Sequence, residues 1–265
     1  MNVLDEIMQG VLLDLASRQV PINDLKQQID LAPKLRGAKQ SLSKAGTSLI
    51  AEIKRSSPSK GALSQITDPV ALAKSYERGG ADLISVLTEE RRFNGKITDL
   101  IAVRDAIGLP VLRKDFILTE FQVYESRLLG ADLILLIVAA LSNAQLRDLY
   151  QLSTELGMDV LVEVHDEEEA QRAIDLKAEI IGVNSRNLKT LEVSASVFEE
   201  LIPTIPSSVI RVAESGISTR ADVVQAQKAG ATAILVGESL VKSGDPISAM
   251  RELLGHGQAF AHDNS

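Results

Sequence analysis

The segment Gly80-Ala81-Asp82-Leu83-Ile84 recurs unchanged at Gly130-Ala131-Asp132-Leu133-Ile134 and in altered form at Gly230-Ala231-Thr232-Ala233-Ile234. At each copy a helical pattern ends at the glycine and a short apolar run follows it. Helices often end at glycine because its backbone adopts the left-handed conformation without strain. This recurrence predicts a chain made of repeated strand–helix units.

The helices before these copies begin at recognisable residues. Asp68-Pro69 combines a side-chain cap with a first-turn proline, Thr119 opens the second helix, and Ser218 or Thr219 opens the third. A strand, a helix and a further strand in this order predict a parallel sheet with right-handed crossovers.

Eight short apolar runs, separated by such helical patterns, are the expected strands. Most are apolar at nearly every position, as in parallel strands that are covered on both faces. They are Leu49–Lys54, Leu83–Leu87, Val111–Lys114, Leu133–Val138, Val160–Val164, Ile180–Asn184, Val209–Ala213 and Ala233–Val236.

Eight such units predict an α/β fold, the (β/α)₈ TIM barrel, and a length of 265 residues suits that fold. An open doubly wound sheet is the structural alternative, but it usually has fewer strands and a glycine-rich first turn. The turn after the first expected strand is Arg55-Ser56-Ser57-Pro58-Ser59-Lys60-Gly61, which lacks the G-x-G-x-x-G pattern. We therefore predict the barrel.

The barrel is expected to occupy most of the chain, from residue 48 to 255. Residues 1–47 carry helical patterns at Val3–Ala16 and Ile22–Gln28, which predict an N-terminal helical extension packed on the barrel. Residues 256–265 show no periodicity and are expected to form a flexible C-terminal tail.

The composition argues against several classes of function. The chain has no cysteine and three scattered histidines, so we expect no metal and no cofactor. A formal charge of −8 argues against nucleic-acid binding. The longest apolar stretch, from Leu133 to Leu141, is too short to span a membrane, and the acidic start does not resemble a signal peptide. We expect a cytoplasmic protein that is a monomer or a weak homodimer.

Charged and polar residues stand at the C-terminal ends of the expected strands, where core strands should be apolar. Glu52 and Lys54 flank Ile53, so the two charges share one face of their strand. An uncompensated buried charge costs about 3–5 kcal/mol, so these groups must pair with one another or bind a ligand. The set comprises Glu52, Lys54, Lys114, Glu163, Asn184, Arg186 and Glu214.

Two interpretations of this set are open, a structural ion-pair network and a site that moves protons on an acidic substrate. We favour the site because active sites of these barrels lie at this face. The loops after the seventh and eighth expected strands add Ser215-Gly216 and Gly237-Glu238. Loops at these two places commonly form a phosphate cradle, so their joint occurrence predicts a phosphorylated small-molecule substrate.

Several blocks of the chain resemble signatures of the indole-3-glycerol-phosphate synthase family, and the similarity runs in order from about residue 48 to 254. The resemblance implies a carbon–carbon lyase (carboxy-lyase) without a cofactor that acts in tryptophan biosynthesis. It would convert 1-(2-carboxyphenylamino)-1-deoxyribulose 5-phosphate to indole-3-glycerol phosphate, CO₂ and water. The blocks are Ile50–Gly61, Ser85–Glu89, Arg113–Phe116, Leu161–Val164, Gly182–Leu188 and Ala213–Ile217.

The resemblance also implies roles in the chemistry. Lys114 would be the general acid on the ketone oxygen, and Lys54 would pair with the substrate carboxylate or phosphate and could share the acid role. In the dehydration that follows loss of CO₂, Glu163 and Glu52 are the candidate acid and base.

The remaining residues would bind and orient the substrate. Asn184 and Arg186 would orient it, Glu214 would lie at the same mouth, and Phe116 would form an apolar wall for its ring. The phosphate would be held by Lys54, Ser57, Ser215, Gly216, Gly237 and Glu238, the last through its backbone N–H.

Two rival functions are considered. Phosphoribosylanthranilate isomerases rely on an early cysteine base, which this chain lacks. A catalytically inactive barrel that binds phosphorylated metabolites would need no general acid and base. His165 is interpreted as a polar residue at a strand-to-helix junction, and Asp166-Glu167-Glu168-Glu169 as an acidic first helical turn.

Overall fold

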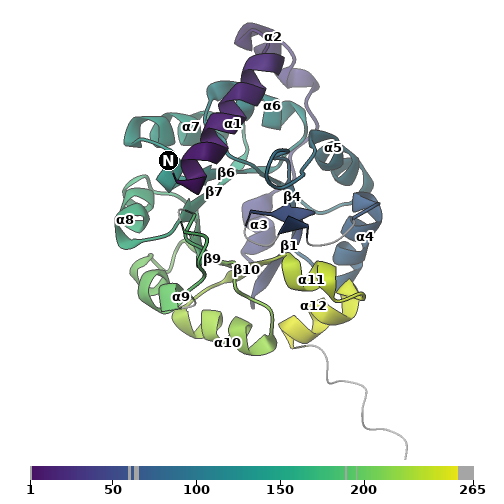
Figure 1. Cartoon of the computed structure of the whole chain (residues 1–265), viewed down its shortest axis with the longest axis vertical. Coiled ribbons are helices and arrows are strands. Elements are labelled where there is room, and N and C mark those ends of the chain that lie inside the picture. Colours follow the sequence, from purple (N-terminus) through teal and green to yellow (C-terminus); the bar gives the residue numbers. More distant parts are fainter. Residues whose placement is uncertain (1, 59–60, 63–65, 189, 195, 256–265) are drawn as a thin grey trace, which may run out of the picture.

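The computed structural model describes residues 2–58, 61–62, 66–188, 190–194 and 196–255. Eight parallel strands close into a barrel in the order β1-β10-β9-β8-β7-β6-β5-β4, with helices around it (Figure 1). The barrel strands are β1 (Ser48–Ile53), β4 (Leu83–Leu87), β5 (Val111–Lys114), β6 (Leu133–Ile137), β7 (Asp159–Val164), β8 (Ile180–Asn184), β9 (Ile210–Glu214) and β10 (Ala233–Val236). The predicted (β/α)₈ barrel is confirmed.

Helices follow the strands along the chain and form the outer ring. They are α4 (Pro69–Gly79), α5 (Ile97–Ala106), α6 (Glu120–Leu128), α7 (Asn143–Glu155), α8 (Glu167–Asp175), α9 (Ser196–Leu201), α10 (Arg220–Ala229), α11 (Glu238–Lys242) and α12 (Pro246–Leu254), with short 3₁₀ turns η2 (Val138–Ala140) and η3 (Ile202–Thr204). The predicted helix starts are confirmed, because the side chains of Asp68, Thr119 and Thr219 each accept a hydrogen bond from the first turn. None of the helices in the described ranges is long and apolar enough to cross a membrane.

Four of the predicted strands have boundaries that are wrong by one residue: β1, β6, β9 and β7, which begins at Asp159 and not at Val160. β1 ends at Ile53, whose pairing with Val86 is the last in that ladder, and β6 gives way to η2 at Val138. β9 is shifted toward its C-terminus and includes Glu214, which pairs with Asn184. Apolar patterning cannot locate these ends, because they depend on the register of the neighbouring strand.

The repeated segment has a structural role at the N-terminal end of the barrel. The backbone N–H of Asp82 donates to the carbonyl of Leu49 (2.9 Å), and its carboxylate accepts the N–H of Leu49 (2.9 Å). Asp132 makes the same two bonds with Val111, at 2.9 and 2.8 Å. In the third copy, the hydroxyl of Thr232 replaces the carboxylate. The repeat therefore clamps the start of one strand to the next.

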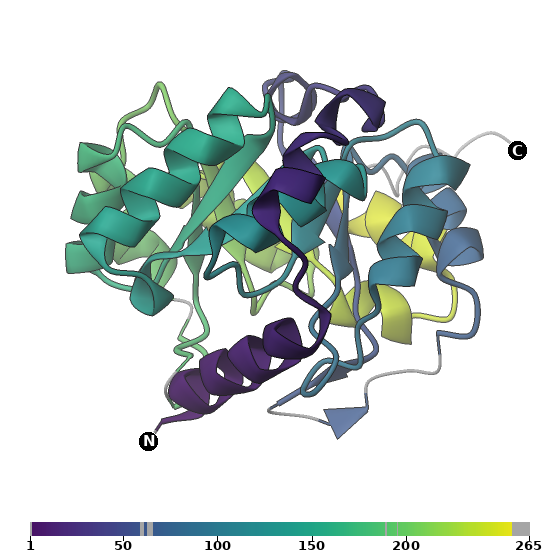
Figure 2. The ribbon, with the colours of Figure 1, turned by 90° about the horizontal axis from the view of Figure 1, so that it is seen from above.

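Four helical segments precede β1: α1 (Val3–Arg18), α2 (Ile22–Lys26), η1 (Ile29–Leu31) and α3 (Ala38–Leu42). Figure 2 shows α1 at the same end of the molecule as β2 (Ser56–Ser57) and β3 (Gly61–Ala62), the short antiparallel pair that follows β1. The apolar face of α1 packs into the same buried cluster as Phe116 and Phe121.

Two ion pairs tie α1 to the loop between β4 and α5. Asp14 pairs with Arg91, and Glu6 pairs with Arg92, each at 2.6 Å. The first helix, α1, thus reaches the end of the barrel at which the C-termini of the strands lie.

Candidate active site

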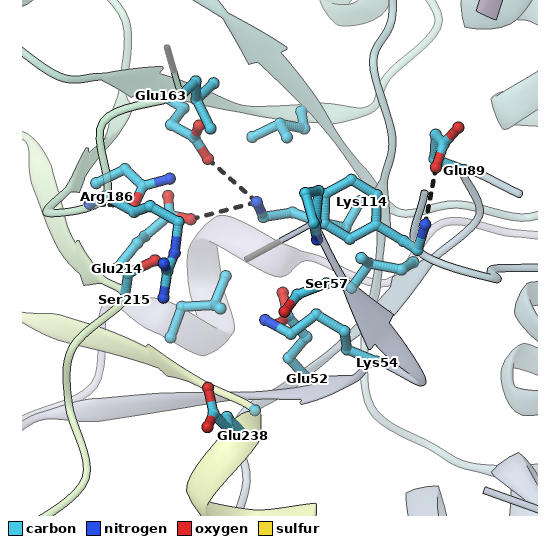
Figure 3. Close-up of a pocket in the computed structure, with 18 of the residues that line it drawn as sticks. Glu52, Lys54, Ser57, Glu89, Lys114, Glu163, Arg186, Glu214, Ser215 and Glu238 are labelled. Carbon is cyan, nitrogen blue, oxygen red and sulfur yellow. Dashed lines mark hydrogen bonds and ion pairs between the residues drawn. The ribbon is translucent and has the colours of Figure 1, made fainter. Parts of the chain in front are cut away.

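A pocket opens at the C-terminal ends of the barrel strands (Figure 3). Every residue that the sequence predicted for the site lines this pocket, so the structure brings the whole predicted set together. These residues are Glu52, Lys54, Ser57, Lys114, Phe116, Glu163, Asn184, Arg186, Glu214, Ser215, Gly216, Gly237 and Glu238.

Lys114 occupies the centre of the pocket. Its Nζ lies 3.1 Å from Oε2 of Glu163 and 3.6 Å from Oε2 of Glu214, as the dashed lines in Figure 3 show. Burial by itself lowers the pKa of a lysine, but the carboxylates of Glu163, Glu214 and Glu52 outweigh that effect and raise the pKa of Lys114. Lys114 is therefore an ammonium ion that faces open pocket space.

The two carboxyl groups beside Lys114 are in opposite protonation states. Burial raises the pKa of Glu163, but Lys114, His165 and the amide of Asn184 more than reverse this and hold the pKa well below its usual range. Burial and the neighbouring Glu163 charge raise the pKa of Glu214 to about 8, against the opposing effect of Lys114. At neutral pH the pocket thus holds Glu163 as a carboxylate and Glu214 as a neutral acid.

The low pKa of Glu163 bears on the acid role that the family resemblance implied for this residue. In the resting site Glu163 carries no proton, so it cannot act as an acid until it receives one. The sequence could not reveal this, because the low pKa results from the positions of Lys114 and His165, which only folding sets.

The raised pKa of Glu214 predicts a pH effect on stability. The unfolded chain loses this proton near pH 4.5, whereas the folded protein keeps it to about pH 8, so the stability that Glu214 contributes at low pH is lost as the pH rises through 8. Glu214→Gln cannot ionise. We expect the free energy of unfolding of this variant, relative to that of the wild type, to increase as the pH rises from 5 to 8, by at most about 1.4 kcal/mol per pH unit. Denaturant titrations across this range measure the difference, and parallel curves would contradict the assignment.

Glu52 and Lys54 form a second charge pair at the pocket. Nζ of Lys54 lies 2.5 Å from Oε1 of Glu52. Glu52 is buried, while Lys54 remains partly exposed toward the mouth. The backbone of Gly237 passes so close that a Cβ there would lie 2.8 Å from Oε1 of Glu52. Glycine at this position leaves room for the carboxylate.

Gly182, in β8, leaves room for the carboxyl group of Glu214. A Cβ on this residue would collide with Oε1 of Glu214. We expect Gly182→Ala to push Glu214 away from Lys114, lowering kcat at least about tenfold, and to destabilise the fold by about 1–3 kcal/mol through overpacking. Steady-state kinetics and chemical denaturation test both effects. A variant with wild-type activity and stability would show that the strand yields without moving Glu214.

The loop after β9 turns sharply into the pocket. Ser215 and Gly216 both have positive φ, at 66° and 72°, and the hydroxyl of Ser185 donates to the carbonyl of Ser215 at 3.1 Å. On the neighbouring loop, Gly237 precedes α11, and the carboxylate of Glu238 pairs with Lys242 at 2.8 Å. These two loops present backbone to the same side of the pocket.

Arg186 is fixed to its own loop after β8. Its Nη1 donates to the carbonyl of Leu191 at 2.9 Å, and its backbone N–H donates to Oδ1 of Asn184 at 3.0 Å. The guanidinium is thus held at the pocket rim (Figure 3).

Glu89 and Phe93 line the pocket but were not assigned from the sequence. Glu89 is buried, and its carboxylate accepts backbone N–H groups from Arg91, Arg92 and Phe93 at 2.8–3.0 Å. The ring of Phe93 lies 6.1 Å from that of Phe116, so the two rings form one wall. The position of Glu89 after a strand could have marked it, but Phe93 stands in a loop that lacks any pattern.

No group of three His, Asp or Glu side chains in the described part of the chain is arranged to hold a metal ion. The pocket itself combines two lysine–carboxylate pairs, an aromatic wall and two backbone loops. Such a site can bind an anionic aromatic ligand and transfer protons to it.

The sequence matches the family profile described as Indole-3-glycerol phosphate synthase over residues 4–253. The chain belongs to the indole-3-glycerol phosphate synthase family. The resemblance identified from the sequence blocks is therefore confirmed.

Curated relatives extend this agreement over nearly the whole chain. Indole-3-glycerol phosphate synthase of Streptomyces griseus is 52% identical over 259 residues, which cover 97% of this chain and 96% of the relative. The Mycolicibacterium smegmatis protein of the same name is 52% identical over 258 residues, covering 97% and 95%. A crystal structure of 3-hexulose-6-phosphate synthase superposes with a TM-score of 0.65 at 17% identity, over 79% of this chain and 99% of that one. This last likeness shows a shared fold alone.

Proposed function

We propose that the protein converts 1-(2-carboxyphenylamino)-1-deoxyribulose 5-phosphate to indole-3-glycerol phosphate, CO₂ and water, as a lyase of tryptophan biosynthesis. The observation that carries the proposal is the buried ammonium of Lys114, held by Glu163 and Glu214 at the floor of a pocket with an aromatic wall. A binding protein has no need for a buried acid and several carboxyl groups at one point.

The first step is ring closure. The ammonium of Lys114 donates a proton to the ketone oxygen while the ring carbon that bears the carboxylate attacks the ketone carbon. Lys54, paired with Glu52, lies where it can bind the substrate carboxylate or phosphate. The carboxylate then leaves as CO₂, and its bonding electrons restore the aromatic ring.

Dehydration completes the indole. The hydroxyl group formed in the first step leaves as water, which requires an acid, and a proton leaves the neighbouring carbon, which requires a base. Glu52 serves as the base and Glu163 as the acid once it has been protonated. Because Glu214 beside them is neutral, it adds no further negative charge to the pocket.

The remaining residues hold the substrate in place. Phe116 and Phe93 form the wall for the anthranilate ring, and Asn184 and Arg186 orient the carboxylate and the sugar. The phosphate is held between the loops after β1, β9 and β10, by Lys54, Ser57, Ser215, Gly216, Gly237 and the backbone of Glu238.

The same proposal covers the organisation of the chain. We take residues 1–47 as a helical extension and 48–255 as the catalytic barrel; the expected tail, 256–265, lies outside the described residues. We expect the protein to act in the cytoplasm, as a monomer or a weak homodimer, on a free phosphorylated metabolite.

Incubating the purified protein with the carboxyphenylamino-deoxyribulose phosphate and following indole fluorescence tests the activity. We expect fluorescence to rise with stoichiometric release of CO₂. An isomerase would produce this compound from its isomer and not consume it, and a binding protein would leave its concentration unchanged. Either of these outcomes would reject the proposal.

A further inference from the structure

His165 lies behind Glu163, on the side away from Lys114. It follows β7 directly, and its Nε2 is 3.2 Å from Oε1 of Glu163, whose other oxygen, Oε2, faces Lys114. On the opposite edge of the ring, Nδ1 lies 2.9 Å from Oε2 of Glu169 in the first turn of α8. Lys114, Glu163, His165 and Glu169 therefore form a continuous row of alternating charges.

Glu169 fixes both the position and the protonation of the imidazole. The same Oε2 that faces Nδ1 also accepts the backbone N–H of His165 at 2.9 Å, so the carboxylate can only act as an acceptor. A proton on Nδ1 therefore completes the hydrogen bond to the ionised carboxylate. A carboxylate beside each ring nitrogen favours the doubly protonated form; Nε2 lies at ion-pair distance from Glu163 but is not aligned with it as a hydrogen bond.

The charges around His165 support this form. Burial lowers the pKa of the imidazole, but Glu163 and Glu169 reverse this and raise the pKa to about 10. A hollow on the outer side of His165 is also lined by Asp166 from the same junction, Glu167 from the start of α8 and Glu200 from α9. Among the described side chains of this row, Lys114 is the only cation besides His165, and it lies on the far side of Glu163.

We propose that His165 is a positioning residue that works through Glu163: it orients this carboxylate and supplies the proton that Glu163 delivers during dehydration. The inference rests on the function proposed above. When Lys114 has given its proton to the ketone oxygen, Glu163 loses one of its two cationic neighbours. A small rotation of the Glu163 carboxyl group aligns Oε1 with Nε2 of His165, and the proton on Nε2 then moves to Oε1, leaving a neutral imidazole.

The protons balance over the reaction. Glu163 passes its proton to the departing hydroxyl, whose carbon–oxygen bond breaks with the electron pair on oxygen, so that water leaves and Glu163 is again a carboxylate. Glu52 has gained one proton from the substrate, and that proton can restore Lys114. The reaction takes up one further proton because an ionised carboxylate leaves as neutral CO₂. Solvent in the outer hollow returns this proton to His165.

The test separates release of CO₂ from formation of indole in a single turnover. In His165→Gln the side-chain amide can reach Glu163 with an N–H group, but it has no proton to transfer. We expect CO₂ to appear at close to the wild-type rate and indole to appear at least about tenfold more slowly, with KM changed less than about twofold. Glu168→Gln, an exposed change on the same helix, is the control and should keep the wild-type lag between the two signals.

The outcomes distinguish this inference from the proposed function. A wild-type protein that forms no indole overturns the function, whereas an active wild type and a His165→Gln variant with an unchanged lag overturn only the role of His165. A variant in which both signals slow equally also overturns it, since that result indicates a structural effect. If thermal unfolding shows that His165→Gln does not fold, His165→Asn carries the same expectations.

Discussion

Replacing Lys114 by alanine is expected to lower kcat by about 10²–10⁴-fold, the usual contribution of a positioned general acid. No other described side chain places an ammonium between Glu163 and Glu214, so a water molecule would have to take its place as the acid. The loops proposed to hold the phosphate follow other strands, so the affinity for inorganic phosphate should stay within about twofold of the wild-type value. Indole fluorescence gives the rate, and phosphate competition gives the affinity.

The same variant should remain folded. Without the ammonium, the folded protein can bind a proton at Glu163 and so avoid an uncompensated buried charge. Binding this proton becomes less favourable as the pH rises, so the loss of stability should grow with pH. Lys74→Ala, an exposed substitution on α4, is the matched control and should behave as the wild type. Near-normal turnover of Lys114→Ala would remove this residue from the role of acid.

The largest effect on stability is expected at the opposite end of the barrel. Asp132 is fully buried, and its carboxylate accepts the backbone N–H groups of Arg36 and Val111 at 2.7 and 2.8 Å and pairs with Arg104 at 3.2 Å. Asp132→Ala leaves a buried guanidinium and two N–H groups without this partner. We expect the free energy of unfolding to fall by about 3–5 kcal/mol, measured by denaturant titration, with kcat of the folded fraction unchanged.

Asp82 offers a matched control because it occupies the same place in the repeat. Its carboxylate makes the equivalent bond to Leu49, but its side chain is 16% exposed, and its cationic partner Lys44 is 59% exposed. Water can replace the lost contacts, so Asp82→Ala should cost only about 1 kcal/mol. Equal losses of unfolding free energy in the two variants would show that burial of the carboxylate does not determine how much these strand-to-strand contacts stabilise the fold.

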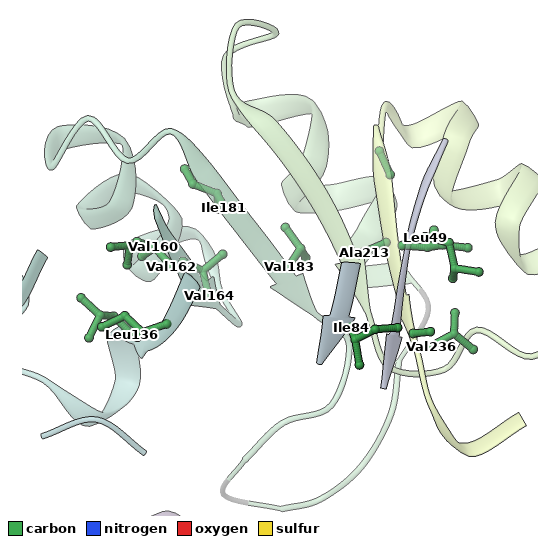
Figure 4. Close-up of a cluster of buried hydrophobic side chains, with 14 of the residues drawn as sticks. Leu49, Ile84, Leu136, Val160, Val162, Val164, Ile181, Val183, Ala213 and Val236 are labelled. Atoms are coloured by element: carbon green, nitrogen blue, oxygen red, sulfur yellow. The ribbon is translucent and has the colours of Figure 1, made fainter. Parts of the chain in front are cut away.

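The fold could be predicted because strands covered on both faces leave an unmistakable pattern. Figure 4 shows the layer that explains it: Val162, Val183 and Ile84 lie in the apolar cluster between the strands and the surrounding helices. The alternate residues, such as Leu161, belong to the inner cluster of the barrel. The ends of β6 and β9 could not be predicted, since hydrogen-bonding partners far along the chain determine them.

The site could be located for a similar reason, because the C-terminal ends of parallel strands must meet at one end of a closed barrel. Charges at those ends, such as Glu163 and Lys114, were therefore expected together. Their protonation could not be predicted, since it depends on distances of 3–4 Å between side chains that only the folded structure sets. His165 shows this most clearly, because the junction position was predicted and the contact with Glu163 was not.

The attachment of α1 has a consequence for how the molecule responds to salt. The pairs that join Asp14 to Arg91 and Glu6 to Arg92 are exposed, so added ions screen them. The N–H groups of Arg91, Arg92 and Phe93 instead bond to the carboxylate of Glu89, which is only 4% exposed, so added ions screen these bonds less. At high ionic strength, the first helix therefore loosens its hold on the loop, while the loop keeps the shape that places Phe93 in the pocket wall.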